Sequence, residues 1–132
     1  MNTDEHRLLI EKKYSHQEIT AEIINAAYKV HNMLGYGFLE KVYHNALVIE
    51  LENRNFLVES QRQINVLYDE KVVGEFYADV LVDDKVIVEI KSTDTHNPLF
   101  EAQLLNYLKA SGIKIGLIIN FGPSVKVKRM VL

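Results

Sequence analysis

Three charged side chains lie in segments that otherwise consist of apolar strand-forming residues. Asp79 interrupts the run FYADVLV, and Glu89 and Lys91 lie in VIVEIK. Because side chains alternate between the two faces of a strand, Glu89 and Lys91 project to the same side. If a turn at residues 83–84 pairs the two strands, Asp79 comes near the level of Glu89 and Lys91. Two carboxylates and an ammonium group would then meet on one patch of sheet.

Such a patch has the chemistry of a site for a hard metal ion. Two carboxylates a few ångströms apart repel each other, so one of them takes up a proton unless a cation lies between them. Oxygen ligands without His or Cys favour Mg²⁺ or Mn²⁺, which retain waters for a phosphate substrate and lower the pKa of a bound water. Lys91 would orient that water or stabilise the charge of the transition state. The same residues also fit a half-solvated strand face, which commonly carries charges.

Two helices are expected before these strands. Ser15 followed by Glu18 forms a capping-box pattern, and apolar residues then recur with helical spacing until a glycine-rich turn at Gly35. A second helix is expected from Leu39 to Asn53. Three runs of β-forming residues follow within residues 57–91, and short acidic turns separate them. This part of the chain predicts an antiparallel meander.

The last part of the chain predicts one helix and two strands. Pro98 opens the helix and Gly112 closes it. Residues 115–121 are apolar, which indicates a strand buried on both faces, and residues 125–132 form a last strand. The order α-α-β-β-β-α-β-β therefore predicts a central mixed β-sheet flanked by helices, an α/β (α+β) fold.

Length and composition limit the classes of protein that fit. A chain of 132 residues is enough for one domain, expected over residues 15–132 after a short leader at residues 1–14. The absence of cysteine excludes disulfides, zinc ribbons and thiol catalysis. No apolar run reaches the roughly 20 residues that span a bilayer, so no membrane partner is expected. The N-terminus lacks the apolar stretch of a signal peptide, which makes the cytoplasm the expected location.

Charge is distributed unevenly along the chain. Fifteen basic and eighteen acidic residues give a net charge of −3, which argues against nonspecific coating of nucleic acid. The C-terminal part nevertheless has five basic residues and no acidic one: Lys109, Lys114, Lys126, Lys128 and Arg129. These side chains could contact a nucleic-acid backbone, or they could form a solvated strand edge that discourages aggregation. Both interpretations fit the sequence.

Several motifs, in the right order, resemble those of one superfamily. Asp79, nine intervening residues and then Glu89-Ile90-Lys91 resemble the PD-(D/E)XK nuclease signature, with Ala78 where that signature has proline. Gln103 to Tyr107 resembles the Gln-x-x-x-Tyr helix motif of its exonuclease-like branches. Residues 37–43, GFLEKVY, resemble the motif that names the small GxxExxY proteins, which are grouped with these nucleases. The resemblance covers roughly residues 16–132.

The resemblance implies a PD-(D/E)XK nuclease-like fold and a Mg²⁺ (or Mn²⁺) cofactor. It assigns metal binding to Glu40, Asp79 and Glu89, with the Ile90 carbonyl as a further ligand, and it makes Lys91 the catalytic lysine. The implied reaction is hydrolysis of a phosphodiester bond by a metal-activated water, leaving a 5′-phosphate and a 3′-hydroxyl. The implied partner is nucleic acid, with DNA favoured over RNA. Related folds often dimerise, which makes a homodimer one option.

Four further residues have two interpretations each. The resemblance places Gln103 and Tyr107 in support of the active site or in contact with substrate, whereas a surface Gln and a core Tyr would fit as well. His44 follows Glu40 by four residues and so could reach the same cleft, or it could be a surface histidine. Ser92 could bind phosphate or merely end its strand. The alternative for the whole chain is a binding or protein-interaction module that retains the fold without useful turnover.

Overall fold

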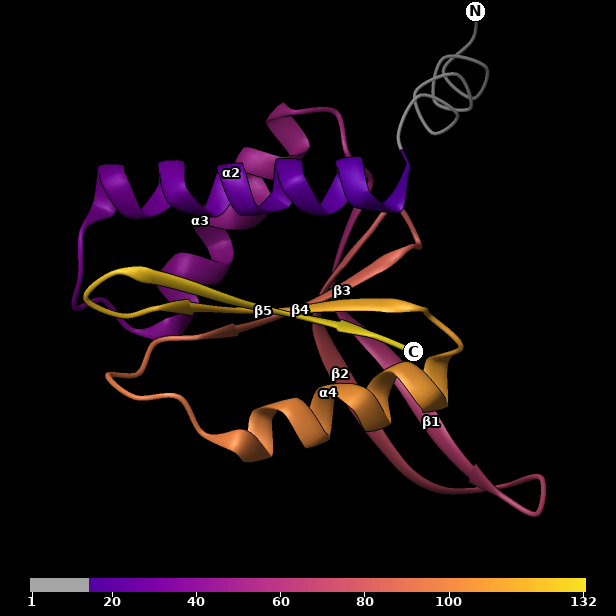
Figure 1. Cartoon of the computed structure of the whole chain (residues 1–132). Helices are drawn as coiled ribbons and strands as arrows, with labels where there is room; N and C mark the ends of the chain where they lie inside the picture. The colour runs from indigo at the N-terminus through magenta and orange to yellow at the C-terminus, as the bar shows by residue number, and fades with distance from the viewer. Residues whose placement is uncertain (1–14) are drawn as a thin grey trace, which may run out of the picture.

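The computed structural model describes residues 15–132, and the predicted leader at residues 1–14 lies outside this part (Figure 1). The described residues form three helices and five strands in the predicted order. In sequence they are α2 (His16–Leu34), α3 (Glu40–Asn53), β1 (Val58–Tyr68), β2 (Lys71–Val82), β3 (Val86–Lys91), α4 (Pro98–Ser111), β4 (Ile115–Phe121) and β5 (Val125–Val131). The predicted α/β class and element order are confirmed.

Local signals account for where the helices begin and end. The Ser15 side chain accepts a hydrogen bond from the Glu18 N–H while the Glu18 side chain accepts one from the Ser15 N–H, so the predicted capping box is present. Asn97 caps α4 ahead of Pro98. Gly112 ends α4 in the left-handed conformation, with φ of 77°.

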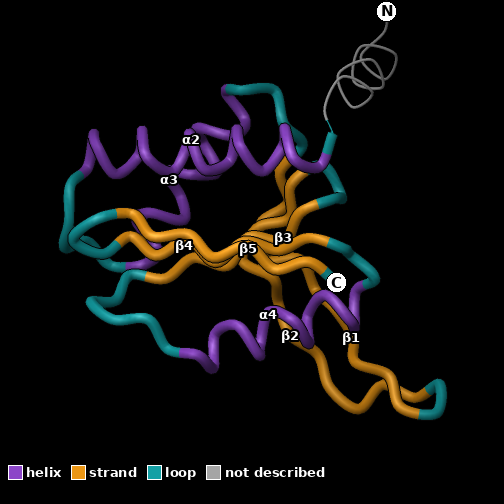
Figure 2. The backbone as a smooth tube through the Cα atoms, in the orientation of Figure 1, coloured by secondary structure: helices purple, strands orange, loops and turns teal. Residues whose placement is uncertain are grey.

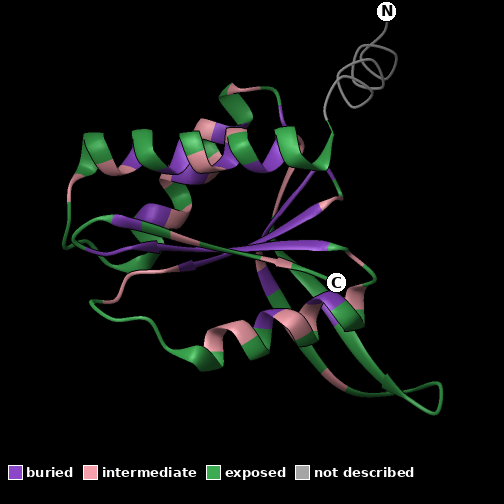
Figure 3. Ribbon diagram, in the orientation of Figure 1, coloured by how far each residue is buried: buried purple, intermediate pink, exposed green. Residues whose placement is uncertain are grey.

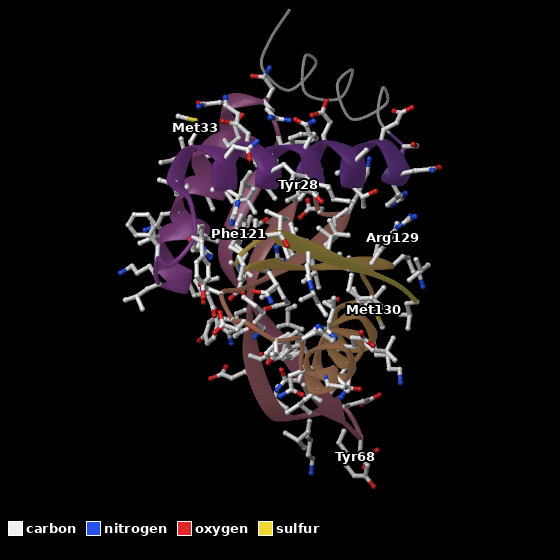
Figure 4. The ribbon with its side chains drawn as sticks, turned by 60° about the vertical axis from the view of Figure 1, so that its left-hand side comes forward. Tyr28, Met33, Tyr68, Phe121, Arg129 and Met130 are labelled. Carbon is white, nitrogen blue, oxygen red and sulfur yellow. The ribbon has the colours of Figure 1, made fainter. Side chains whose placement is uncertain are left out.

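The five strands form one mixed sheet in the order β1-β2-β3-β4-β5. Neighbouring strands are antiparallel except β3 and β4, which are parallel and are joined by α4. Figures 1 and 2 show α2 and α3 on one face of the sheet and α4 on the other, so the molecule has three layers. The β1–β2 hairpin extends beyond α4 (Figure 2), and Figure 4 shows Tyr68 at its far end, at the opposite end of the molecule from Met33.

Each face of the sheet has its own hydrophobic core (Figure 3). α2 and α3 pack on the first face through fully buried residues that include Ile23 and Leu47. Leu104 and Leu108 of α4 pack on the second face, where Gly116 makes room because a Cβ there would lie 2.8 Å from a methyl carbon of Leu104. β4 lies between both cores and is buried at every position, as its apolar sequence predicts.

Strands β2 and β3 separate part-way along the sheet. They pair over only three positions, from Val82↔Val86 to Val80↔Val88. β3 continues to pair with β4 as far as Lys91, whereas β2 continues only with β1 into the long hairpin. The β2–β3 pairing therefore ends at Val80, and the sheet is open at Asp79, the residue before Val80 in β2. No helix among the described residues is long and apolar enough to cross a membrane.

Candidate active site

Asp79 and Glu89 meet where β2 leaves β3. Continuing the antiparallel register by one residue beyond Val80↔Val88 places Asp79 opposite Glu89. At this point the Asp79 Oδ2 atom accepts a hydrogen bond of 2.8 Å from the Ile90 N–H, so a side chain takes the place of a backbone acceptor. Glu89 lies two residues after Ile87, which packs on α4, so the Glu89 carboxylate projects to the α4 face of the sheet.

Glu89 is buried without full hydrogen bonding. The residue is 8% exposed, and its Oε1 atom has no hydrogen-bond partner among the described residues. Burial and the neighbouring Asp79 carboxylate raise the pKa of Glu89 to about 9, and the Lys91 ammonium only partly opposes this rise. In the absence of a further cation, the Glu89 carboxyl group is therefore protonated at neutral pH.

Glu40 is the first residue of α3 and approaches the same two residues. Although the residue as a whole is exposed, partial desolvation of its carboxyl group raises the pKa of Glu40. Lys91 lowers that pKa and Asp79 raises it further, which shows that both charges act on Glu40. The helix start, the opened sheet edge and the end of β3 thus bring three carboxylates and one ammonium into electrostatic contact.

Tyr43 holds the turn that places Glu40. The Tyr43 hydroxyl donates a hydrogen bond of 2.6 Å to the Gly35 carbonyl and accepts one of 3.2 Å from the Phe38 N–H. Its ring is fully buried and stacks on Phe121, with centroids 4.7 Å apart. Tyr43 is the last residue of the GxxExxY-like motif, but the resemblance assigned a role only to the glutamate of that motif, Glu40.

Lys91 and α4 form the other side of the site. Lys91 Nζ lies 4.5 Å from the centroid of the Phe100 ring, a cation–π contact that holds the ammonium at the end of β3. Tyr107 stacks on Phe76 with centroids 3.7 Å apart, and burial together with Glu89 and Asp79 raises the pKa of its hydroxyl. Tyr107 is therefore both packed and directed toward the carboxylates. Gln103 is exposed one turn earlier on α4.

Comparison with known families agrees with this arrangement. A model of the PD-(D/E)XK nuclease superfamily matches residues 17–130. The chain belongs to this superfamily. A solved structure described as "Crystal structure of SSO0001" has the same fold, with a TM-score of 0.54 at 19% identity over 70% of this chain and 50% of that one. The chain thus spans half the length of that protein. No curated protein matches the sequence.

A divalent cation fits the central residues of this superfamily member. A cation between the two side chains would bind the unpaired Glu89 Oε1 atom and take the place of the proton that Glu89 otherwise holds beside Asp79. Within residues 15–132, no three His, Cys, Asp or Glu side chains are already clustered as a complete metal site. Asp79 and Glu89, which lie opposite each other, are the residues that would bind the ion directly, and Glu40 lies beside them at the start of α3.

The remaining candidates divide between the site and the scaffold. His44 lines a cleft of about 580 Å³ together with Glu40 and Asp79, so the structure places it beside the site. Ser92 instead donates a hydrogen bond of 2.9 Å from its hydroxyl to the Phe38 carbonyl, which ties the end of β3 to the turn before α3. The Ser92 hydroxyl therefore has a structural hydrogen bond, which fits the option that this residue ends its strand.

Proposed function

We propose that this superfamily member is a metal-dependent nuclease. The observation that supports this function best is the buried Glu89 carboxyl group, which has an unpaired oxygen and a repelling neighbour in Asp79. Burying such a pair is unfavourable unless a bound cation offsets the charge. A buried carboxyl pair lowers the stability of the fold, whereas an apolar residue at the position of Glu89 would stabilise the sheet without that desolvation penalty.

Each side chain has a distinct part in the proposed reaction. Asp79 and Glu89 hold Mg²⁺ or Mn²⁺, with Glu40 and the Ile90 carbonyl as further oxygen ligands. The ion supplies an acidified water and offsets negative charge on the phosphoryl oxygens. The Lys91 ammonium orients the attacking water or stabilises the transition state by hydrogen bonding.

The products follow from which bond breaks. The water oxygen forms a new bond to phosphorus, the bond from phosphorus to the 3′ oxygen breaks, and a proton passes to that oxygen. The products are a 5′-phosphate and a 3′-hydroxyl. Tyr107 and Gln103 support the site from α4 or contact the substrate.

Nucleic acid is the proposed substrate, with DNA favoured over RNA. Lys126 and Lys128 are exposed on the α4 face of β5 and, with His96, line a second cleft of about 300 Å³. Register pairs Lys91 with Asn120 and Asn120 with Lys126, so these cations belong to the same face of the sheet as Lys91. A phosphate backbone that leaves the site around α4 would meet them. A homodimer would extend this surface.

A second function is a nucleic-acid-binding module without turnover. The observation that favours it is that no three candidate ligands form a ready-made metal site within the described part of the chain. Such a module would bind oligonucleotides without cleaving them. It would also tolerate loss of the Lys91 ammonium, which the nuclease would not.

A cleavage assay separates these functions. Single-stranded, double-stranded and branched DNA and RNA are incubated with wild type, Lys91→Ala and the matched control Lys71→Ala, with Mn²⁺ or with EDTA. Lys71 is exposed at the tip of the hairpin, far from the site. The nuclease predicts cleavage that EDTA abolishes and that Lys91→Ala lowers by about 100-fold or more, with no effect of Lys71→Ala. Binding without cleavage would support the module, and cleavage unchanged by Lys91→Ala would reveal a contaminant.

A further inference from the structure

The backbone of β1 is distorted at one residue beside the site. Gln61 has a φ of 55°, the left-handed conformation that is unfavourable for a non-glycine residue and unusual within a strand. The ladder between β1 and β2 keeps one register from Val58 to Val66 but skips Gln61, which stands opposite Asp79. Such irregularities redirect a side chain and are frequent next to active sites.

This distortion borders a cleft that continues from the proposed metal ligands and is lined by residues with polar groups. The cleft of about 580 Å³ lies between α3 and β1, and Glu40 and Asp79 belong to its lining. The remaining lining residues all carry polar groups: Lys41, His44, Asn45, Ser60 and Gln61. The His44 Nε2 atom lies 3.3 Å from the Ser60 Oγ atom, so a hydrogen bond joins α3 to β1 across the cleft.

The chemistry of this lining fits a nucleotide. The amides of Asn45 and Gln61 each present both donors and an acceptor, which is what the edge of a base requires. The Lys41 ammonium suits a phosphate oxygen. His44 and Ser60 add further groups that can donate or accept.

We infer that this cleft binds the nucleotide adjacent to the scissile phosphate and that Gln61 determines which base it accepts. The inference rests on the proposed function, because Asp79 and Glu40 are what bring a phosphate to the end of the cleft. The left-handed backbone at Gln61 would place the side-chain amide of this residue in the cleft, at the level of Asp79. An undistorted strand would place residue 61 in the ladder.

The test uses Gln61→Gly in the full chain with Lys91→Ala added to prevent cleavage. Glycine adopts the positive φ without strain, so the melting temperature should stay the same or rise. Asn55→Gly is the matched control, because Asn55 has a φ of 69° in the turn after α3, outside the cleft. Fluorescence anisotropy with labelled oligo-dA, oligo-dC and oligo-dT in Mn²⁺ reports affinity and base preference, and calorimetry reports binding of Mn²⁺ alone.

Gln61→Gly should weaken oligonucleotide binding by about tenfold for the preferred base and reduce the differences between bases. Mn²⁺ affinity should stay within about twofold of the parent, because an amide in the cleft is not a ligand. Asn55→Gly should change neither. A second pair, His44→Ala against His16→Ala, an exposed histidine at the start of α2, should show the same contrast in affinity.

Two results would overturn the inference in distinguishable ways. If the parent binds Mn²⁺ and oligonucleotides but Gln61→Gly and His44→Ala bind every oligonucleotide as the parent does, the cleft is not the nucleotide site and the proposed nuclease stands. If the parent binds neither Mn²⁺ nor any oligonucleotide, the proposed function fails and the inference fails with it.

Discussion

At the scale of single residues, Glu89 is the most informative side chain in the molecule. It lies in a strand whose other members, apart from Lys91, are apolar, yet it remains a carboxyl group next to a second one, Asp79. With a pKa of about 9, the metal-free protein holds a proton there at neutral pH. A divalent cation must displace that proton, so metal affinity should rise as pH increases toward 9.

The raised pKa of Glu89 also predicts how stability depends on pH. The pKa of Glu89 in the folded protein, about 9, exceeds the ordinary value of 4.5. Below pH 4.5 the carboxyl group is protonated in both the folded and the unfolded protein. Between pH 4.5 and pH 9 only the folded protein holds the proton, so the free energy of unfolding falls as pH rises through this range. In EDTA, wild type should therefore lose stability between pH 5 and pH 8 relative to Glu89→Gln, which keeps the shape without the charge. Urea unfolding should show the stability of Glu89→Gln relative to wild type increasing by about 4 kcal/mol between pH 5 and pH 8. Parallel pH curves for the two proteins would contradict the burial of Glu89 beside Asp79.

Some site residues followed from the sequence and others did not. Alternation along a strand was enough to place Glu89 and Lys91 on one face, because that period is a local property. The distortion at Gln61 depends on how β1 pairs with β2, and the contact between Lys91 and Phe100 depends on how α4 packs. Neither is encoded in neighbouring residues, so neither could be predicted.

At the scale of elements, the site depends on how the turn before α3 is held. Tyr43 joins Gly35 and Phe38 through its hydroxyl, and Ser92 ties Phe38 to the end of β3. These bonds connect the residue that starts α3, Glu40, to the strand that carries Glu89. The turn therefore fixes the start of α3 relative to the end of β3.

Tyr43→Phe tests whether the Tyr43 hydroxyl holds the turn before α3. The change keeps the stacked ring but leaves the Gly35 carbonyl and the Phe38 N–H without their partner, which should lower the free energy of unfolding by about 1–2 kcal/mol. Mn²⁺ affinity should fall with it, because Glu40 loses its fixed position. Tyr28→Phe, an exposed tyrosine on α2 (Figure 4), is the control and should change neither quantity. Equal stability of both variants in urea would show that the Tyr43 hydroxyl does not hold the turn.

The sequence predicted the elements better than the way they diverge. Caps such as Ser15 and Gly112 act within one turn of chain, so the helix limits were predictable. The separation of β2 from β3 beyond Val80 was not predicted, because the run of apolar residues gives no sign of where pairing stops. That separation is what opens the sheet at Asp79.

At the scale of the whole molecule, the uneven charge has a structural counterpart. The proposed metal ligands Asp79 and Glu89 lie where β2 and β3 part, and the exposed Lys126 and Lys128 lie two strands away from β3 on the α4 face. A bound cation would lower the negative potential at the first place. At the second place, a phosphate would compete with Glu101, whose Oε1 atom lies 4.0 Å from Lys128 Nζ. The net charge of −3 is therefore compatible with a nucleic-acid partner.

The salt dependence of oligonucleotide binding measures the contribution of this second surface. Each phosphate contact contributes about 0.7 to the slope of log affinity against log salt for a single strand. Lys126→Ala with Lys128→Ala should therefore reduce the slope by about 1.4. The control Lys71→Ala with Lys85→Ala has the same change in charge at the turns of the hairpin and of β2–β3. Equal slopes for the two double variants would show that only net charge matters and that β5 makes no contact.

Binding of Mn²⁺ by the protein alone tests the central claim most directly. Isothermal titration should show one ion bound by wild type and by Glu52→Gln, an exposed glutamate at the end of α3. Asp79→Asn and Glu89→Gln should each lose that binding, and a proton should be released as the wild type binds. Equal binding by all four proteins, or none by the wild type, would contradict a metal centre at Asp79 and Glu89.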